Sequence, residues 1–298
     1  WRRNRHFMPL GRIAWDFNRD PLDGGTVKWG NSLLRQRPMA NVTTLVLERK
    51  FQRNPEIGVP YPTLFHPTSD DELDRWRAAI ARHKRRWLVT FVGASNRSFD
   101  TEEVREIRVR LTAQCEEERN RDKCRVVECG SGTGAGTRLA CEREPEEVVR
   151  VLAASVFCLQ PRGDSATRKG FFDTILAGCI PVVFSNRTAF EQYPYHLAHT
   201  LSLGSSRATP FSVFIPEELI LGGGINVIHA LSLIPGDHIR ALQRSVRRLI
   251  PNVIYADTFG DQQEEPRYHR PDAFSIAIDA LLDKLPPPPP ISGMNILL

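Results

Sequence analysis

The sequence lacks several features that mark common classes of protein. No run of about 18 apolar residues occurs, so no printed segment is expected to cross a bilayer as a helix. The sequence has no initiating methionine and no amino-terminal signal peptide. No RNA- or DNA-binding motif accompanies its basic residues, which argues against nucleic acid as a partner.

Two common binding motifs are also missing. Four of the six cysteines fall within one stretch, at Cys115, Cys124, Cys129 and Cys141. Their spacing lacks the paired C-x-x-C pattern that is typical of zinc sites. The other two, Cys158 and Cys179, lie in apolar runs and are expected to be buried and reduced. The glycine-rich segment 130–136 is out of place for a dinucleotide-binding fingerprint, so it is interpreted as a surface loop.

What the sequence does contain is typical of a packed globular protein. Its 298 residues allow two domains of ordinary size, and 41% are hydrophobic against 25% charged. The formal net charge of +5, with a pI near 9.0, suits an anionic ligand. Helices are expected over 70–87, 101–121 and 234–249.

The stretch 154–186 has the strongest pattern. An apolar strand at 156–159 leads into a polar loop at 162–170, followed by a short helix and a second apolar strand. The loop carries five side chains that can donate hydrogen bonds to an anion: Arg162, Ser165, Thr167, Arg168 and Lys169. Such loops lie at the carboxyl edge of a parallel sheet, where a helix N-terminus attracts anions. The pattern indicates a diphosphate cradle, and the alternative is a solvated turn that happens to be basic.

The string FCLQPRGDSATRKGFFDTILAGCIPVVF resembles the signature of the exostosin family of glycosyltransferases. It is most similar to the plant branch that includes the xyloglucan galactosyltransferases. The likeness extends from WDF at 15–17 to the LIP-x-V-x-Y segment at 249–255. The resemblance implies an α/β fold of the GT-B type and an inverting transfer from a UDP-sugar. It also implies that no cofactor or bound metal is needed.

Site residues follow from the resemblance. It implies that the diphosphate is held by Arg162, Ser165, Thr167 and Arg168. Asp173 stands at the position of a carboxylate that binds the ribose hydroxyls, and its alternative role is that of an acid favoured by the helix dipole. Gly93 and Arg97 follow a predicted strand at 87–92 and are expected to belong to the donor site as well.

An inverting transfer also needs a base that takes the proton of the acceptor hydroxyl. His6 and Asp16 are the candidates, because they lie in the segment that resembles the acceptor side of the family. The alternative is that His6 is a packed, hydrogen-bonded histidine and that Asp16 forms a structural ion pair with Arg12 or Arg19. Arg5 departs from the family pattern, which has Asp before the histidine.

The same resemblance predicts the domain organisation. Residues 1–80 are expected to be the end of an incomplete, acceptor-side Rossmann-like domain. Residues 81–285 form the Rossmann-like domain that binds the nucleotide-sugar, and 286–298 form a proline-rich tail. Family members are type II Golgi proteins, so a membrane anchor is expected in a missing amino-terminal region.

A luminal location favours disulfides. The preferred pairing joins Cys115 to Cys124 and Cys129 to Cys141.

These expectations combine into one predicted function. The protein transfers a sugar, with galactose preferred, from a UDP-sugar to a cell-wall polysaccharide such as xyloglucan. One alternative is a glucuronosyl- or arabinosyltransferase of the same family. The other is a noncatalytic partner that binds a UDP-sugar or glycan in a Golgi transferase complex.

Overall fold

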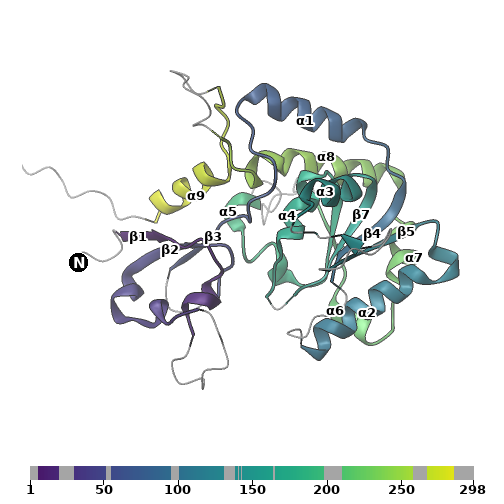
Figure 1. Ribbon diagram of the computed structural model, residues 1–298, viewed down its shortest axis with the longest axis horizontal. Coiled ribbons are helices and arrows are strands. Elements are labelled where there is room, and N and C mark those ends of the chain that lie inside the picture. Colours follow the sequence, from purple (N-terminus) through teal and green to yellow (C-terminus); the bar gives the residue numbers. More distant parts are fainter. Residues whose placement is uncertain are drawn as a thin grey trace, which may run out of the picture. The chain divides into compact units, whose positions relative to one another are not determined.

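The computed structural model describes residues 6–19, 30–51, 55–94, 101–130, 138–139, 141, 143–163, 165–197, 210–257 and 267–284. Figure 1 shows the chain, which divides into two compact units. Unit 1 comprises Trp1–Gly58 with Ala277–Leu298, and unit 2 comprises Val59–Ile276. This division falls before helix α1 (Asp70–Arg82), whereas the boundary expected near residue 80 falls within it. The proline-rich tail and Arg97 lie outside the described residues.

Unit 1 contains a three-stranded parallel sheet in the order β1-β2-β3. Its strands are β1 (His6–Pro9), β2 (Val42–Val46) and β3 (Glu56–Gly58). Three short 3-10 helices accompany the sheet: η1 (Ala14–Phe17), η2 (Leu33–Arg35) and η3 (Arg37–Asn41). The central strand β2 is buried along its whole length, as expected where a sheet is covered on both faces.

Unit 2 is built on a six-stranded parallel sheet in the order β6-β5-β4-β7-β8-β9. The strands are β4 (Trp87–Gly93), β5 (Cys124–Cys129), β6 (Arg138–Leu139), β7 (Ser155–Gln160), β8 (Ile180–Val183) and β9 (Val213–Phe214). The parallel sheets of the two units confirm the expected α/β class.

Helices cover both faces of the sheet in unit 2. Helices α2 and α7 pack on one face, whereas α3, α4 and α8 lie on the other (Figure 1). The helices after α1 are α2 (Glu102–Glu116), α3 (Pro145–Ala153), α4 (Lys169–Leu176), α5 (Pro194–Leu197), α6 (Glu217–Leu221), α7 (Val227–Ser232), α8 (Gly236–Val253) and α9 (Ala273–Leu282). None of the helices within the described ranges is long and apolar enough to cross a membrane.

The order of the strands changes direction between β4 and β7. From β4 the chain moves outward to β5 and β6, and it then returns through α3 to β7 on the opposite side of β4. Phe91 on β4 and Phe157 on β7 are fully buried at this centre. In open α/β sheets, ligands bind outside the carboxyl ends of the strands at such a switch point.

Helix α8 is longer than the expected 234–249 and continues past Pro251 to Val253. Proline has no N–H to donate to the carbonyl four residues earlier, which here is that of Arg247. Arg77 on α1 supplies the missing donor, because its Nε lies 3.2 Å from the Arg247 carbonyl oxygen. A tertiary hydrogen bond thus takes the place of the helical one that proline removes.

Two disulfides confirm the preferred pairing. They join Cys115, near the end of α2, to Cys124 at the start of β5, and Cys129, the last residue of β5, to Cys141. The bonded cysteines are separated by 9 and 12 positions in the sequence, so both disulfides close short loops.

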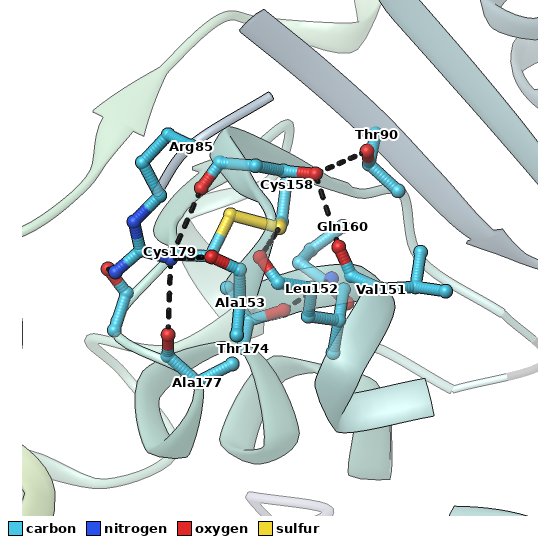
Figure 2. The surroundings of a disulfide bond; sticks show 12 residues. Arg85, Thr90, Val151, Leu152, Ala153, Cys158, Gln160, Thr174, Ala177 and Cys179 are labelled. Carbon is cyan, nitrogen blue, oxygen red and sulfur yellow. Dashed lines mark hydrogen bonds between the residues drawn. A yellow bond between two sulfur atoms is a disulfide. The ribbon is translucent and has the colours of Figure 1, made fainter. Parts of the chain in front are cut away.

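The expectation that Cys158 and Cys179 are reduced is wrong, because they form a third disulfide (Figure 2). Both residues are fully buried, as expected. Cys158 on β7 pairs in register with Pro181 on β8, and Cys179 directly precedes β8. The two α-carbons therefore lie only 6.0 Å apart, within the range that a disulfide spans. The register of the two strands, which the apolar pattern does not reveal, brings the sulfurs together.

Beside this disulfide lies the partly buried side chain of Arg85 (Figure 2). Its guanidinium donates hydrogen bonds of 2.5–3.3 Å to the carbonyls of Ile80, Ala153, Ser155, Ala177 and Gly178. Several of these carbonyls belong to the ends of α3 and α4, which lack helical donors and attract cations. Burial lowers the pKa of Arg85 to about 10, so it stays charged at neutral pH.

Candidate functional site

Arg168 lies at the switch point of the sheet and is the centre of the candidate site. Arg168 is the N-cap residue of α4, and its guanidinium lies against Gly93 at the carboxyl end of β4. A methyl group added to Gly93 would stand 2.7 Å from Nη2 of Arg168 and 3.3 Å from Nη1. A side chain at position 93 would therefore displace the guanidinium from this strand end, and it would also stand 3.1 Å from Cζ of Phe91.

The loop after β7 brings a second glycine to the same arginine. A methyl group on Gly163 would stand 3.6 Å from Cδ of Arg168. The loop is closed on itself by a hydrogen bond of 3.1 Å from the Gly163 N–H to the Ser165 carbonyl oxygen. Arg168 therefore lies beside the carboxyl ends of both central strands, β4 and β7, with the first turn of α4 following directly.

Close packing sets the position of α4 behind this loop. The Gln160 side chain at the end of β7 donates to the Thr174 hydroxyl at 2.8 Å. A methyl group on Gly170 would stand 3.2 Å from Oε1 of Gln160, so glycine allows the helix to approach the strand. The N-terminus of α4, with its dipole and its backbone N–H groups, is thereby held at the sheet edge.

The two hydroxyl residues of the loop bind main chain. The hydroxyl of Thr167 is buried and donates to the Thr188 carbonyl oxygen at 2.6 Å. The Ser165 hydroxyl donates to the Thr167 carbonyl oxygen at 3.2 Å. Both side chains hold the shape of the loop in this structure.

Arg162 lies between two carboxylates. Its Nε is 2.9 Å from Oε2 of Glu217 on α6, and its Nη2 is 3.1 Å from Oε2 of Glu103 on α2. Burial raises the pKa of Glu217, and the hydrogen bonds and charge of Arg162 oppose that rise. The predicted diphosphate ligand is thus also a link between the β7 loop and two helices.

Asp173 lies in the second turn of α4 with 5% of its surface exposed. Its two carboxylate oxygens accept hydrogen bonds from Lys169 Nζ at 2.6 and 2.8 Å. Burial raises the pKa of the Asp173 carboxyl, and the Lys169 charge opposes that rise. Its predicted contact with a ribose stays a prediction, and the ion pair with Lys169 is what the structure shows.

The two candidate bases lie in unit 1 and have different surroundings. His6 begins β1, at the amino end of the strand, and is exposed. Asp16 lies in η1, beyond the carboxyl end of β1, and only 4% of its surface is exposed. Its carboxylate is 2.9 Å from Arg12 Nε and 3.7 Å from Arg19 Nη2. Both ion pairs of the structural alternative are present, and the role of either residue as a base stays a prediction.

Three residues near the site escaped the sequence reasoning: Glu103, Arg108 and Glu217. Arg108 could have been noticed, because it falls among the apolar positions 104, 107 and 111 that form the buried face of α2. Glu103 and Glu217 look like ordinary acids in the first turn of a helix. Among the described residues, no group of three or more His, Cys, Asp or Glu side chains is placed to hold a metal ion.

The fold and the site define an α/β protein with an arginine and glycines gathered at a sheet switch point. The chain belongs to the exostosin GT47 family, since the model of the exostosin GT47 domain matches residues 1–230.

Curated relatives from Arabidopsis thaliana agree with this assignment. The chain is 35% identical to xyloglucan galactosyltransferase MUR3 over 94% of this chain and 41% of that protein. It is 34% identical to xyloglucan galactosyltransferase XLT2 and 35% identical to xyloglucan-specific galacturonosyltransferase 1, of which it covers 49% and 39%. The chain thus spans 39–49% of the length of these relatives.

Among solved structures, two bacterial transferases are similar at a low level. The glycosyltransferase WaaG matches at a TM-score of 0.39 and 13% identity, over 81% of this chain and 62% of that one. The pneumococcal O-GlcNAc transferase GtfA, in complex with UDP and GlcNAc, matches at 0.40 and 9% identity, over 81% and 45%.

Proposed function

We propose that the protein is an inverting glycosyltransferase that transfers a sugar from a UDP-sugar to a cell-wall polysaccharide such as xyloglucan. Membership of the exostosin GT47 family and the names of the relatives support the reaction class and the acceptor. The single observation that carries the donor site is the placement of the Arg168 guanidinium against Gly93 at the N-terminus of α4.

This arrangement suits the chemistry of a nucleotide-sugar donor. Negative charge develops on the diphosphate as the bond to the sugar breaks, and a fixed guanidinium and a helix N-terminus stabilise that charge. In the proposal Arg168 makes the main contact, and Ser165, Thr167 and Gly93 shape the loop and strand end around the diphosphate. Asp173 binds the ribose, and Asp16 or His6 takes the proton from the acceptor.

The donor sugar is proposed to be galactose, as in the names of several relatives. A second candidate is galacturonic acid, because a xyloglucan-specific galacturonosyltransferase is as similar to this chain as the galactosyltransferases are. In both cases a Golgi membrane location with a luminal catalytic domain is proposed for the whole protein.

The test incubates the protein with UDP-sugars and a xyloglucan acceptor and measures sugar transfer. Transfer from UDP-galactose or UDP-galacturonic acid that is lost in Arg168→Ala supports the proposal. Binding of UDP without turnover of any donor would instead support the alternative of a noncatalytic partner in a transferase complex. No binding of UDP at all would contradict both.

A further inference from the structure

The structure contains an arginine on α2, Arg108, that is almost completely buried. Only 2% of its surface is exposed, and it is among the largest fully buried side chains of the described residues. A guanidinium removed from water loses hydration that must be replaced by hydrogen bonds. The acceptors of these hydrogen bonds therefore show which parts of the chain stabilise the buried guanidinium.

Arg108 joins the ends of the two central strands. Its Nη1 donates to the carbonyl of Ala94, the residue after β4, at 3.0 Å. Its Nη2 donates to the carbonyl of Arg162, in the loop after β7, at 3.1 Å. The sheet changes direction between these strands, so one side chain bridges the two carboxyl ends at the switch point.

The same guanidinium also reaches the loop beside Arg168. A methyl group on Gly163 would stand 3.2 Å from Nη2 of Arg108 and 3.6 Å from Cδ of Arg168. Gly163 therefore has both arginine side chains as neighbours. The loop that carries the proposed diphosphate contacts is held in place by a second, buried cation.

We infer that Arg108 is a positioning residue for the donor diphosphate, an inference that rests on the proposed function. It joins the residue after β4 to the loop after β7, and it thereby holds the position of the Arg168 guanidinium. Its buried charge also favours an anion at this edge, because an ion is less screened inside a protein than in water. The substrate class it serves is a nucleoside diphosphate, whose ribose is proposed to bind Asp173.

A purely structural role makes a different prediction. Loss of a side chain that only stabilises the fold lowers the binding of uridine and UDP alike. Loss of a residue that positions the diphosphate lowers the binding of UDP and leaves uridine, which carries no phosphate, nearly unchanged. The ratio of the two dissociation constants therefore separates the roles.

The experiment measures dissociation constants for UDP and uridine by calorimetry in the unmodified chain, Arg108→Met and Arg108→Lys. Arg110→Met is the matched control, because Arg110 lies on the same helix with the same charge and pairs with Glu106. We expect Arg108→Met to weaken UDP at least tenfold and uridine less than twofold, Arg108→Lys to weaken UDP less, and Arg110→Met to change neither.

A second variant tests the same role in case Arg108→Met does not fold. Gly163→Ala places a methyl group against Nη2 and keeps every charge, so it should lower UDP affinity selectively if Arg108→Met is too unstable to measure. Equal losses for UDP and uridine, or no loss in any variant, would overturn the role of Arg108 and leave the proposed function standing. Failure of the unmodified chain to bind UDP would overturn both.

Discussion

The guanidinium of Arg168 lies against the backbone of Gly93, so that the residue at the end of β4 must be a glycine for the arginine to keep its place. Gly93 does not have a left-handed backbone conformation, since it is not among the glycines with positive φ. The glycine is therefore explained by the close approach of the Arg168 guanidinium and not by its backbone conformation. A substitution at Gly93 is thus a selective way to displace Arg168.

Gly93→Ala is expected to lower the affinity for UDP about tenfold, or about 1.4 kcal/mol. The added methyl group would displace the Arg168 guanidinium, which stands 2.7 Å from the position of the new carbon. Gly130→Ala is the control, because Gly130 follows the neighbouring strand β5 and nothing lies within 4 Å of its added methyl. Calorimetry with UDP measures both, and equal affinities in the two variants would contradict the prediction.

Arg162 and Glu217 are expected to act as one unit in stability. Arg162→Gln and Glu217→Gln should each lower the free energy of unfolding by about 1–3 kcal/mol, because each breaks the charged hydrogen bonds between these two side chains, and Arg162→Gln also loses the exposed one to Glu103. The double variant should add little to either. Urea unfolding measures this, and fully additive effects would contradict it. A loss of UDP affinity in Arg162→Gln that Glu217→Gln lacks would assign Arg162 a direct contact with the diphosphate.

All six cysteines are expected to be in disulfides. A thiol reagent added to the denatured, unreduced protein should label no cysteine, whereas two labelled thiols would show that Cys158 and Cys179 are reduced. Replacing both of these residues by alanine should lower the free energy of unfolding by about 3 kcal/mol, since the bond closes a 21-residue separation.

His196 is expected to make the fold sensitive to mild acid. It is fully buried, and its Nε2 lies 3.0 Å from the Ala273 carbonyl oxygen, which calls for the tautomer with the proton on Nε2. Burial lowers its pKa from 6.5 to about 4. The unfolded chain therefore binds a proton between pH 6.5 and 4 that the folded chain does not.

The free energy of unfolding should consequently fall as the pH drops through this window, by at most about 1.4 kcal/mol per pH unit from this residue. His196→Gln keeps a donor for Ala273 and should flatten the dependence. Exposed His229 provides the control variant, His229→Gln, which should leave the slope unchanged. Urea unfolding at pH 4.5–7 measures the three slopes, and an unchanged slope in His196→Gln would count against the prediction.

Arg85→Met is expected to lower the free energy of unfolding by at least about 3 kcal/mol, because it leaves several buried carbonyls without a donor. Arg86→Met is the neighbouring control; the Arg86 guanidinium lies over the Trp87 ring. Thermal unfolding compares the two, and similar midpoints would contradict the role of Arg85.

Much of unit 2 could be predicted from the sequence because its signals are local. The apolar runs at 87–92 and 156–159 are strands, and Thr101 caps α2 by accepting from the Val104 N–H. The loop after β7 and the helix behind it also follow from neighbouring residues. So do the two disulfides between cysteines that are close in sequence.

The remaining features depend on residues far apart in the chain. Whether Arg162 meets a carboxylate is decided by the placement of α2 and α6, whose acids are 59 and 55 residues away in sequence. The Cys158–Cys179 bond depends on the register of β7 and β8. The hydrogen bonds of Arg108 depend on the ends of β4 and β7 lying side by side at the switch point. The sequence by itself determined the elements and the cationic loop, because propensity and capping act between near neighbours. Only the tertiary structure decided which partner each charge and each sulfur has, because strand order and register bring distant residues together.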